Sequence, residues 1–218
     1  MPKRRPRMLD MYCAAGGSAR GYGLAGFETT GVDIFDQPNY SGDHFVQGDA
    51  IEYLKAHWRE FDVVHASPPC QAFTAYKRRP GHVAPALNLI PQTREALIET
   101  GLPYVIENVP GAPLLDPIRL CGSAFGLDVR RHRLFESSFV MVSPGCDHSW
   151  QTPRFPQATN RVNLRSTVEV GVYRIPLAEQ KRAMGVDWDV TLHELSQMVP
   201  PAYARWIGAR LMEQIGRG

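Results

Sequence analysis

The 218-residue chain contains no apolar run close to the roughly 18 residues of a membrane-spanning helix, no internal repeat and no low-complexity tract. Its first basic residues lead into a strand-like segment and not into the hydrophobic core of an export signal. Its 44% hydrophobic and 21% charged residues are typical of a globular domain. We therefore expect a cytoplasmic protein that is neither membrane-bound nor disordered.

Cysteine is also scarce. The chain has four cysteines and no CxxC pair, which argues against a disulfide framework. Cys146 and His148 stand two residues apart and supply only two of the four ligands that a structural zinc site needs. A polar loop after Pro144 and Gly145 is the simpler interpretation, so we expect no metal.

Lysine accounts for 4 of the 24 basic residues, and the formal net charge is +2. The excess of arginine has two explanations that stay open: codon usage, or the suitability of arginine for paired contacts with phosphates and bases. Candidate residues for nucleic-acid contact lie in one segment before residue 80 and in a later polar stretch. They are Gln71, Lys77, Arg78, Arg79, Arg154, Arg161 and Arg165.

Cys70 lies in a proline-stiffened turn directly after residues 61–66, a short apolar run of the buried-strand type. Open α/β sheets build their sites at the carboxyl ends of such strands. An isolated cysteine is usually a small buried hydrophobic residue, so Cys70 needs partners before it indicates chemistry.

Possible partners follow later in the chain. Glu107 comes directly after a second apolar strand at residues 103–106. Residues 129–135 alternate like a strand, which would place Arg131 and Arg133 on one face. A thiol, an acid and two arginines could therefore meet in one crevice.

Strands and helices alternate along the first half, which predicts an α/β fold with a doubly wound, mostly parallel Rossmann-like sheet. Strands are expected at residues 8–13, 27–34, 45–47, 61–66 and 103–106, and helices at 18–25, 50–57, 83–100, 177–184, 192–198 and 202–215. Pro91 is expected to interrupt the third of these helices.

The periodicity fades after residue 139, and residues 140–174 are rich in loop-forming and polar types. We expect a catalytic and cofactor-binding domain at residues 1–139, a small loop-rich insert at 140–175, and helices at 176–218 that complete the first domain.

The segment 12–18 is a glycine-containing turn between the first strand and the first helix, where backbone amides can approach a ligand. Asp33 ends the second strand, where an acid would meet ribose hydroxyls, and Asp49 follows the third, where it could accept from an adenine amine. Together they indicate a nucleoside site.

With these residues assembled, the chain resembles the DNA cytosine-5 methyltransferases, in the compact form carried by phages and prophages. The resemblance covers nearly the whole chain and rests on motifs in the family's order. They are residues 10–17, Asp33, Asp49, Pro69-Cys70-Gln71, Glu107-Asn108-Val109, Arg131-His132-Arg133 and residues 197–203.

The resemblance implies S-adenosyl-L-methionine as methyl donor and S-adenosyl-L-homocysteine as product. It places the cofactor on Tyr12, Cys13, Ala14, Gly16, Gly17, Ser18, Asp33, Ile34, Asp49, Ala50 and Pro69. Cys70 would be the nucleophile toward C6 of a flipped cytosine, Glu107 would contact N3, and Arg131 and Arg133 would complete the catalytic group. Arginine charge is expected to help the thiol ionise.

The implied partner is double-stranded DNA in a bacterial cell, in the setting of DNA methylation by phages or restriction-modification systems. A monomer is one option, and a cognate endonuclease is left open. The insert is shorter than the usual target-recognition domain, so we expect a short or loosely defined DNA site. RNA or a free nucleotide as substrate, and a catalytically idle DNA-binding protein, are the alternatives.

Overall fold

A computed structural model describes residues 4–70, 73, 88–153 and 165–216. The strands are β1 (Arg7–Met11), β2 (Glu28–Asp33), β3 (His44–Gln47), β4 (Val63–Ala66), β5 (Tyr104–Asn108), β6 (Ile118–Leu120), β7 (Arg133–Ser137), β8 (Gln151–Pro153) and β9 (Arg165–Thr167). The α-helices are α1 (Gly17–Leu24), α2 (Ala50–His57), α3 (Ile90–Thr100), α4 (Leu177–Met184), α5 (Leu192–Gln197) and α6 (Pro201–Ile215). Among the described residues, no helix combines the length and hydropathy that crossing a bilayer would require.

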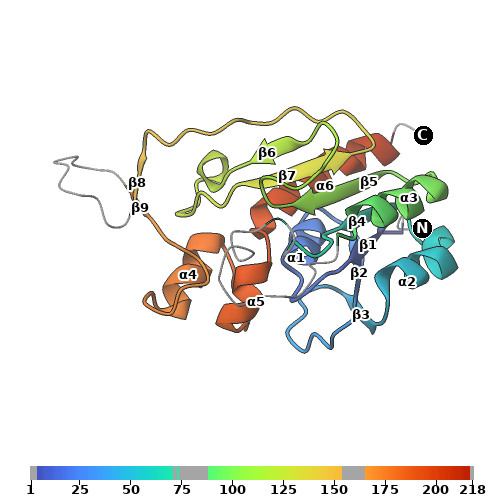
Figure 1. Cartoon of the computed structure of the whole chain (residues 1–218), viewed down its shortest axis with the longest axis horizontal. Helices are drawn as coiled ribbons and strands as arrows, with labels where there is room; N and C mark the ends of the chain where they lie inside the picture. The colour runs from blue at the N-terminus through green and yellow to red at the C-terminus, as the bar shows by residue number, and fades with distance from the viewer. Residues whose placement is uncertain (1–3, 71–72, 74–87, 154–164, 217–218) are drawn as a thin grey trace.

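Seven strands form one sheet in the order β3-β2-β1-β4-β5-β7-β6. The five from β3 to β5 are parallel, and β7 pairs antiparallel with both of its neighbours. The strands β8 and β9 form a separate parallel pair. The predicted doubly wound, mostly parallel sheet is therefore confirmed, with helices on both faces (Figure 1).

Alternation along the central strands divides the core into two layers. Met8 of β1 packs with α1 and α6 on one face, while its neighbour Leu9 packs with α2 and α3 on the other. Neighbouring residues of β4 and β5 divide in the same way. A third cluster joins α4 and α5 to Val129 and Val168, at the end of the molecule away from α2 (Figure 1).

Two of the expected elements differ in detail. Pro91 lies in the first turn of α3 and does not interrupt it, because an amide at that position has no partner within the helix. The expected strand at 129–135 begins only at Arg133, since Arg131 has a φ of 35° that a strand cannot contain. Residues before 88 in the expected third helix lie outside the described part. The edge strand β6 was not expected, because three residues give too short a pattern to recognise.

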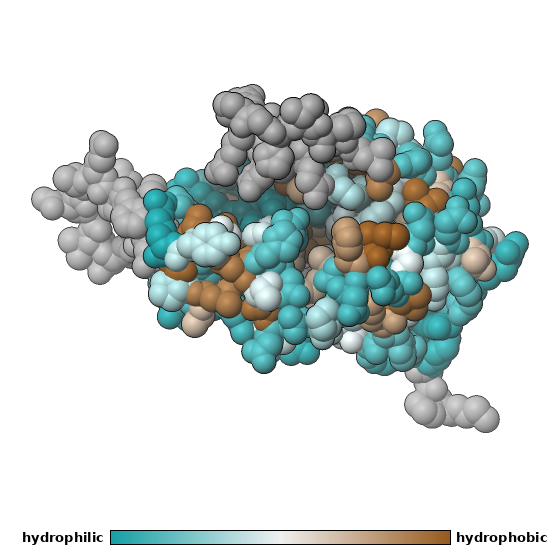
Figure 2. Space-filling view, turned by 60° about the horizontal axis from the view of Figure 1, so that its bottom comes forward, coloured by the Kyte–Doolittle hydropathy of each residue, from teal (hydrophilic) through white to brown (hydrophobic). Residues whose placement is uncertain are grey.

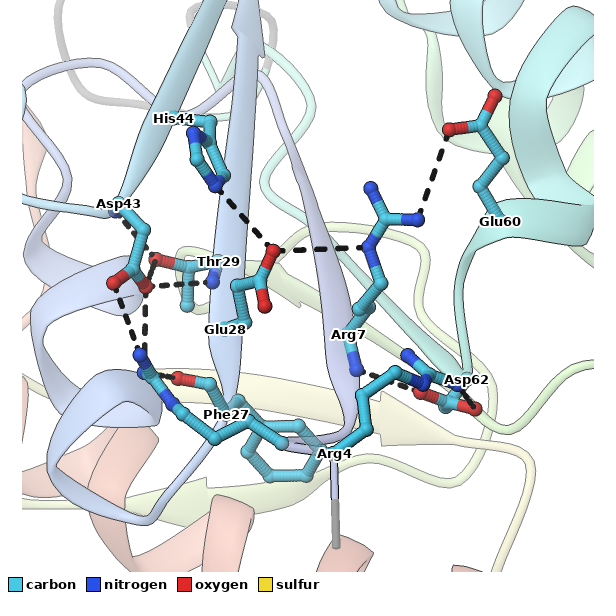
Figure 3. A network of polar contacts seen from close by, with 10 residues as sticks. Arg4, Arg7, Phe27, Glu28, Thr29, Asp43, His44, Glu60 and Asp62 are labelled. Carbon is cyan, nitrogen blue, oxygen red and sulfur yellow. Dashed lines mark hydrogen bonds and ion pairs between the residues drawn. The ribbon is translucent and has the colours of Figure 1, made fainter. Parts of the chain in front are cut away.

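The basic N-terminal segment is tied to the amino-terminal edge of the sheet (Figure 3). Arg4 pairs with Asp62 at 3.1 Å, and Arg5 pairs with Asp43 at 3.1 Å. The backbone amide of Arg7 also donates to Asp62, at 2.6 Å. These contacts hold the N-terminal segment at the amino-terminal ends of the parallel strands, opposite the Cys70 turn.

Candidate active site

Cys70 lies in a turn that two backbone contacts fix to the sheet. The amide of Ser67 donates to the carbonyl of Met11 at 3.1 Å, continuing the β1–β4 pairing past the strand. The buried side chain of Asn108 then donates from Nδ2 to the carbonyl of Pro68 at 2.9 Å. Asn108 ends β5, so the cysteine turn is held against the carboxyl end of the neighbouring strand, and Cys70 itself is half-buried.

Glu107 lies beside this turn, only 7% exposed. Its Oε1 forms an ion pair with Nε of Arg133 at 3.1 Å. Burial raises the pKa of Glu107, while Arg133, Arg131 and a hydrogen bond from Ser67 act in the opposite direction. The net effect is a raised pKa, so the Glu107 carboxyl holds a proton more readily than it would in water.

The pKa of the Cys70 thiol is raised, first by burial and then by the charge of Glu107. Arg133 and Arg131 lower it, in the direction expected from the sequence, but their contribution is smaller. The arginines thus act as expected, but burial and the adjacent acid outweigh them, so the pKa of the thiol is raised on balance.

Arg131 and Arg133 take different positions. Arg133 opens β7 and faces Glu107, whereas Arg131 donates to the carbonyls of Met198, at 2.9 and 2.6 Å, and Ser196, at 2.6 Å. Burial lowers the pKa of Arg131 to about 9, with Arg133 adding to the fall. The electrostatic effect of Arg131 reaches Cys70 and Glu107, but its described hydrogen bonds tie the loop before β7 to the end of α5.

A buried histidine supports the site, and it was not expected from the sequence. His65 of β4 is fully buried, with Nδ1 hydrogen-bonded to the Tyr22 hydroxyl at 2.9 Å. Its Nε2 lies 3.2 Å from Oγ of Ser18 and 2.9 Å from Oγ of Ser67. Burial lowers the pKa of His65 to about 3, so the ring is neutral at physiological pH. These hydrogen bonds connect Ser18 and Tyr22 of α1, through His65, to Ser67, which in turn contacts Glu107.

The turn after β1 is closed by Asp33. Its Oδ2 accepts from the amide of Ala14 and its Oδ1 from the amide of Phe35, both at 3.0 Å. Tyr12 and Ala14 have positive φ angles of 58° and 43°, which are uncommon for residues with a side chain and cluster at functional sites. Gly16, at φ 81°, completes the turn.

Several residues predicted to bind a cofactor have side chains committed to packing. Cys13 and Ala50 are buried. A Cβ on Gly16 would lie 2.8 Å from the amide of Ser41, and one on Gly17 would lie 2.6 Å from the carbonyl of Val199. The side chain of Ser18 is hydrogen-bonded to His65. These residues could offer backbone groups to a ligand, but their side chains shape the turn.

Three other residues at the carboxyl ends of the strands, Asp49, Ile34 and Phe35, keep side-chain groups that a ligand could contact. Asp49 caps α2 by accepting from the amides of Ile51 and Glu52, both at 2.9 Å and both at Oδ1. Next to Asp33, the large apolar side chains of Ile34 and Phe35 are 58% and 72% exposed. The face of the molecule shown in Figure 2 is hollowed near its centre, and hydrophobic residues flank the hollow.

Asp10, at the fourth position of β1, is a further residue that the sequence did not single out as a ligand. It is fully buried, and neither carboxyl oxygen has a hydrogen bond of normal geometry among the described residues. Burial raises its pKa well above the usual range, and Asp33 and Glu107 add to the rise while the Ala19 amide opposes it. Burial therefore favours the neutral form of the Asp10 carboxyl.

The predicted nucleic-acid contacts are not placed by the structure. Gln71, Lys77, Arg78, Arg79, Arg154 and Arg161 lie outside the described residues, and Arg165 is described only as backbone in β9. Pro69, predicted to contact the cofactor, lies in the cysteine turn and is partly buried.

No family model and no curated protein matches the chain. Among solved structures, the S. pombe Dnmt2 methyltransferase aligns with a TM-score of 0.65 and 14% identity, over 97% of this chain and 99% of that one. The Entamoeba histolytica methyltransferase EhMeth aligns with a TM-score of 0.64 and 12% identity, over 98% and 99%. A putative DNA modification methyltransferase from an E. coli prophage is 23% identical over 60% of this chain, with a TM-score of 0.45, and the match spans 45% of its length.

The two long alignments show that this chain has the fold of those methyltransferases. The methyltransferase-like α/β fold predicted from the sequence is therefore confirmed.

Proposed function

We propose that this protein is an S-adenosylmethionine-dependent DNA (cytosine-5)-methyltransferase with Cys70 as its nucleophile. One observation carries the proposal. The Cys70 turn is clamped to the end of β5, where the buried Glu107 pairs with Arg133. The cofactor turn after β1 opens at the same edge of the sheet.

The residues at this edge fit S-adenosylmethionine. Each oxygen of Asp33 accepts one backbone hydrogen bond and keeps a lone pair for a ribose hydroxyl. The exposed Ile34 and Phe35 offer apolar surface to an adenine ring. When bound, the cofactor supplies an electrophilic methyl group.

The chain's own groups would prepare the cytosine. C5 of cytosine is a weak nucleophile, so the ring must first gain electrons. The Cys70 thiolate forms a bond to C6 while Glu107 gives its proton to N3 and holds the exocyclic amine. Arg133, paired with Glu107, keeps that carboxyl in place.

The same groups would then restore the starting state. Once C5 carries the methyl group, its proton leaves to solvent, N3 returns its proton to Glu107, and the C6–sulfur bond breaks to release the Cys70 thiolate. Each bond formed to the enzyme is thus broken, and the only lasting changes are a methyl group gained and a proton lost at C5.

The division of labour between segments is part of the proposal. Residues 1–139 and 176–218 would form the catalytic domain, and residues 140–175 a reduced target-recognition insert. Reading of bases by Arg154, Arg161 and Arg165, and phosphate contact by residues 77–79 together with Gln71, remain predictions. A short insert offers few side chains to base edges, so a short or loosely defined site follows.

The test is transfer of a labelled methyl group to duplex DNA of varied sequence, with tRNA and cytosine nucleotides as parallel substrates. We expect 5-methylcytosine in DNA, and we expect Cys70→Ala to abolish transfer while cofactor binding persists. Preferential labelling of tRNA or nucleotides would replace the DNA substrate but keep the chemistry. Normal turnover by Cys70→Ala would refute the covalent mechanism.

An idle binding protein is distinguished in the same experiment. It would bind the cofactor or DNA but label no substrate at any salt concentration. Sequencing methylated cytosines in DNA from cells that express the chain would then give the recognised site.

A further inference from the structure

Four side chains with metal-binding atoms come together at the end of β6, away from the Cys70 turn. They are Cys121, His132, Cys146 and His148, and their ligand atoms all lie within 4.8 Å of one another. Sγ of Cys121 lies 3.2 Å from Nε2 of His148, and Sγ of Cys146 lies 3.5 Å from Nε2 of His132. The four residues are separated along the chain, but their side chains lie close together in the structure.

These distances match a tetrahedral zinc site. With Zn–S bonds of about 2.3 Å and Zn–N bonds of about 2.0–2.1 Å, neighbouring ligand atoms are separated by about 3.3–3.8 Å. The sulfur–nitrogen distances of 3.2 and 3.5 Å lie just below and within that range. Two thiolates and two imidazoles also form one of the standard donor sets of structural zinc, and soft sulfur donors favour zinc over magnesium or calcium.

We propose that Cys121, His132, Cys146 and His148 bind a structural zinc ion. The sequence showed only the Cys146 and His148 half of this set, and on that half alone a polar loop was the better interpretation. Folding brings the other half from the end of β6 and from the residue before β7. The proposal does not depend on the proposed function.

The surroundings support a built site. The hydroxyl of the buried Ser123 donates to Sγ of Cys121 at 3.2 Å and accepts from the amide of Asp147 at 3.2 Å. Hydrogen bonds of this kind orient ligands in metal sites. Cys121 is fully buried, whereas Cys146 is exposed, so the site lies at the surface with one ligand anchored in the core.

A metal ion bound to these four residues would join three segments of the chain: the end of β6, the loop before β7 and the segment before β8. His132 stands between Arg131 and Arg133, so a bond to it would fix the loop that presents both arginines. Cys146 and His148 lie in the first part of the insert, before β8, and Gln151 of β8 already donates to the carbonyl of Leu127 at 2.9 Å. The zinc ion would thus anchor the base of the insert beside the arginine loop.

The test starts from the full chain, purified under reducing conditions without a chelator, with its metals measured by mass spectrometry. We expect about one zinc ion per chain. Replacement of zinc by cobalt should give the intense visible absorption of a tetrahedral cobalt–thiolate centre. Chelation should lower the unfolding temperature and speed amide hydrogen exchange at residues 129–137, because that loop loses its cross-link.

Substitutions at Cys146 and His148, the ligands on the surface side of the site, test zinc binding with little effect on the packing of the core. Cys146→Ser and His148→Asn should each lower zinc affinity by more than about tenfold, the range seen for weaker changes around metal sites. Cys70→Ser is the matched control, since it removes a thiol elsewhere and should retain zinc.

Two results would overturn the site. One is a chain that binds neither zinc nor cobalt and unfolds identically with and without a chelator. The other is a Cys121–Cys146 disulfide found by mass mapping of the protein from reducing cells. Loss of zinc by Cys70→Ser would assign the metal to the catalytic thiol and would also refute the proposal.

Discussion

At the scale of single residues, the candidate site is governed by burial. Glu107 and Cys70 both have raised pKa values, and burial is the first cause for each. The raised pKa lets Glu107 hold a proton more readily than in water, which suits proton donation, whereas the Cys70 thiol must be ionised before it can attack. Arg133 acts on both groups, since it pairs with Glu107 and lowers the pKa of Cys70.

The charges around Cys70 predict opposite shifts for two matched variants. Glu107→Gln removes an anion that raises the thiol pKa, so the pH at which Cys70 becomes reactive should fall. Arg133→Gln removes a cation that lowers it, so that pH should rise. The alkylation rate of Cys70 against pH, followed by peptide mass mapping, measures both. Shifts of the same sign would contradict this arrangement of charges.

The same acid predicts a catalytic effect. Glu107→Gln should lower methyl transfer by about 10²–10⁴-fold, because the amide can hold the base but cannot exchange the proton. Transfer needs the Cys70 thiolate and the protonated Glu107 together, so in the wild type activity should rise with pH up to the raised pKa of Glu107 and fall only above the raised pKa of Cys70. The pH profile of single-turnover transfer, with cofactor binding as control, checks this. An unchanged rate in the variant would exclude the acid role.

Asn108 predicts a positioning effect. Asn108→Ala leaves the buried carbonyl of Pro68 without its donor, at a cost of about 1–3 kcal/mol in stability, and frees the Cys70 turn. We expect methyl transfer to fall more than cofactor binding, measured by single-turnover kinetics and calorimetry. Asn108→Asp, which keeps the shape but loses the donor, should behave like Asn108→Ala, and recovery by Asp would argue against the hydrogen bond.

At the scale of elements, α1 and α6 pack at the closest approach that glycine allows. A Cβ on Gly21 of α1 would lie 2.2 Å from the carbonyl of Pro201 and 2.7 Å from Cβ of Ala204. A Cβ on Gly208 of α6 would lie 2.6 Å from Cβ of Ala25. The glycines around α1 therefore serve helix packing as well as the turn that precedes the helix.

A pair of glycine variants in one helix tests this packing. Gly21→Ala should destabilise the protein by about 1–3 kcal/mol, because backbone and not a flexible side chain fills the space. Gly23→Ala has nothing within 4 Å and should stabilise it by about 0.5–1 kcal/mol through helix propensity. Denaturant unfolding compares the two. Equal effects would show that helix propensity alone decides.

The joint between α3 and β7 depends on a buried ion pair. Arg94 donates from Nε and Nη2 to the two carboxyl oxygens of Glu136, each at 2.7 Å, with side-chain exposures of 15% and 4%. Arg94→Met should cost about 3–5 kcal/mol because it strands the carboxylate. The exposed Arg4 pair with Asp62 is the control, and Arg4→Met should cost less than about 1 kcal/mol. Similar losses in equilibrium unfolding would contradict the role of burial.

At the scale of the whole molecule, one edge of the sheet gathers the groups that the proposal needs. The parallel strands β1, β2, β4 and β5 end side by side there, while the basic N-terminal segment is held at the other edge. Ligand binding at such an edge couples distant segments and therefore stabilises the fold as a whole.

Cofactor binding should be visible in global stability. S-adenosylhomocysteine at about 100 times its dissociation constant should raise the free energy of unfolding by about 2.7 kcal/mol. Asp33→Ala should lose most of this gain, because it removes the proposed ribose acceptor and the acceptor of the Ala14 amide. Thermal and denaturant unfolding with and without ligand measure the effect. A full gain in the variant would place the ligand elsewhere.

The sequence by itself determined the alternation of strands and helices, the position of Cys70 and Glu107 at the carboxyl ends of two strands, and the placement of Asp33 and Asp49 at the ends of the second and third strands. These follow from local apolar periodicity, glycine and proline, which act over a few neighbouring residues. The roles assigned to the site residues remain predictions.

Only the tertiary structure decided the rest. It gave Arg131 a left-handed backbone that ends the expected alternation, and it made burial outweigh arginine charge at Cys70. It also buried His65 and brought Cys121 and His132 to Cys146 and His148. Burial and contacts between distant residues arise only when the chain packs, so no local pattern could contain them.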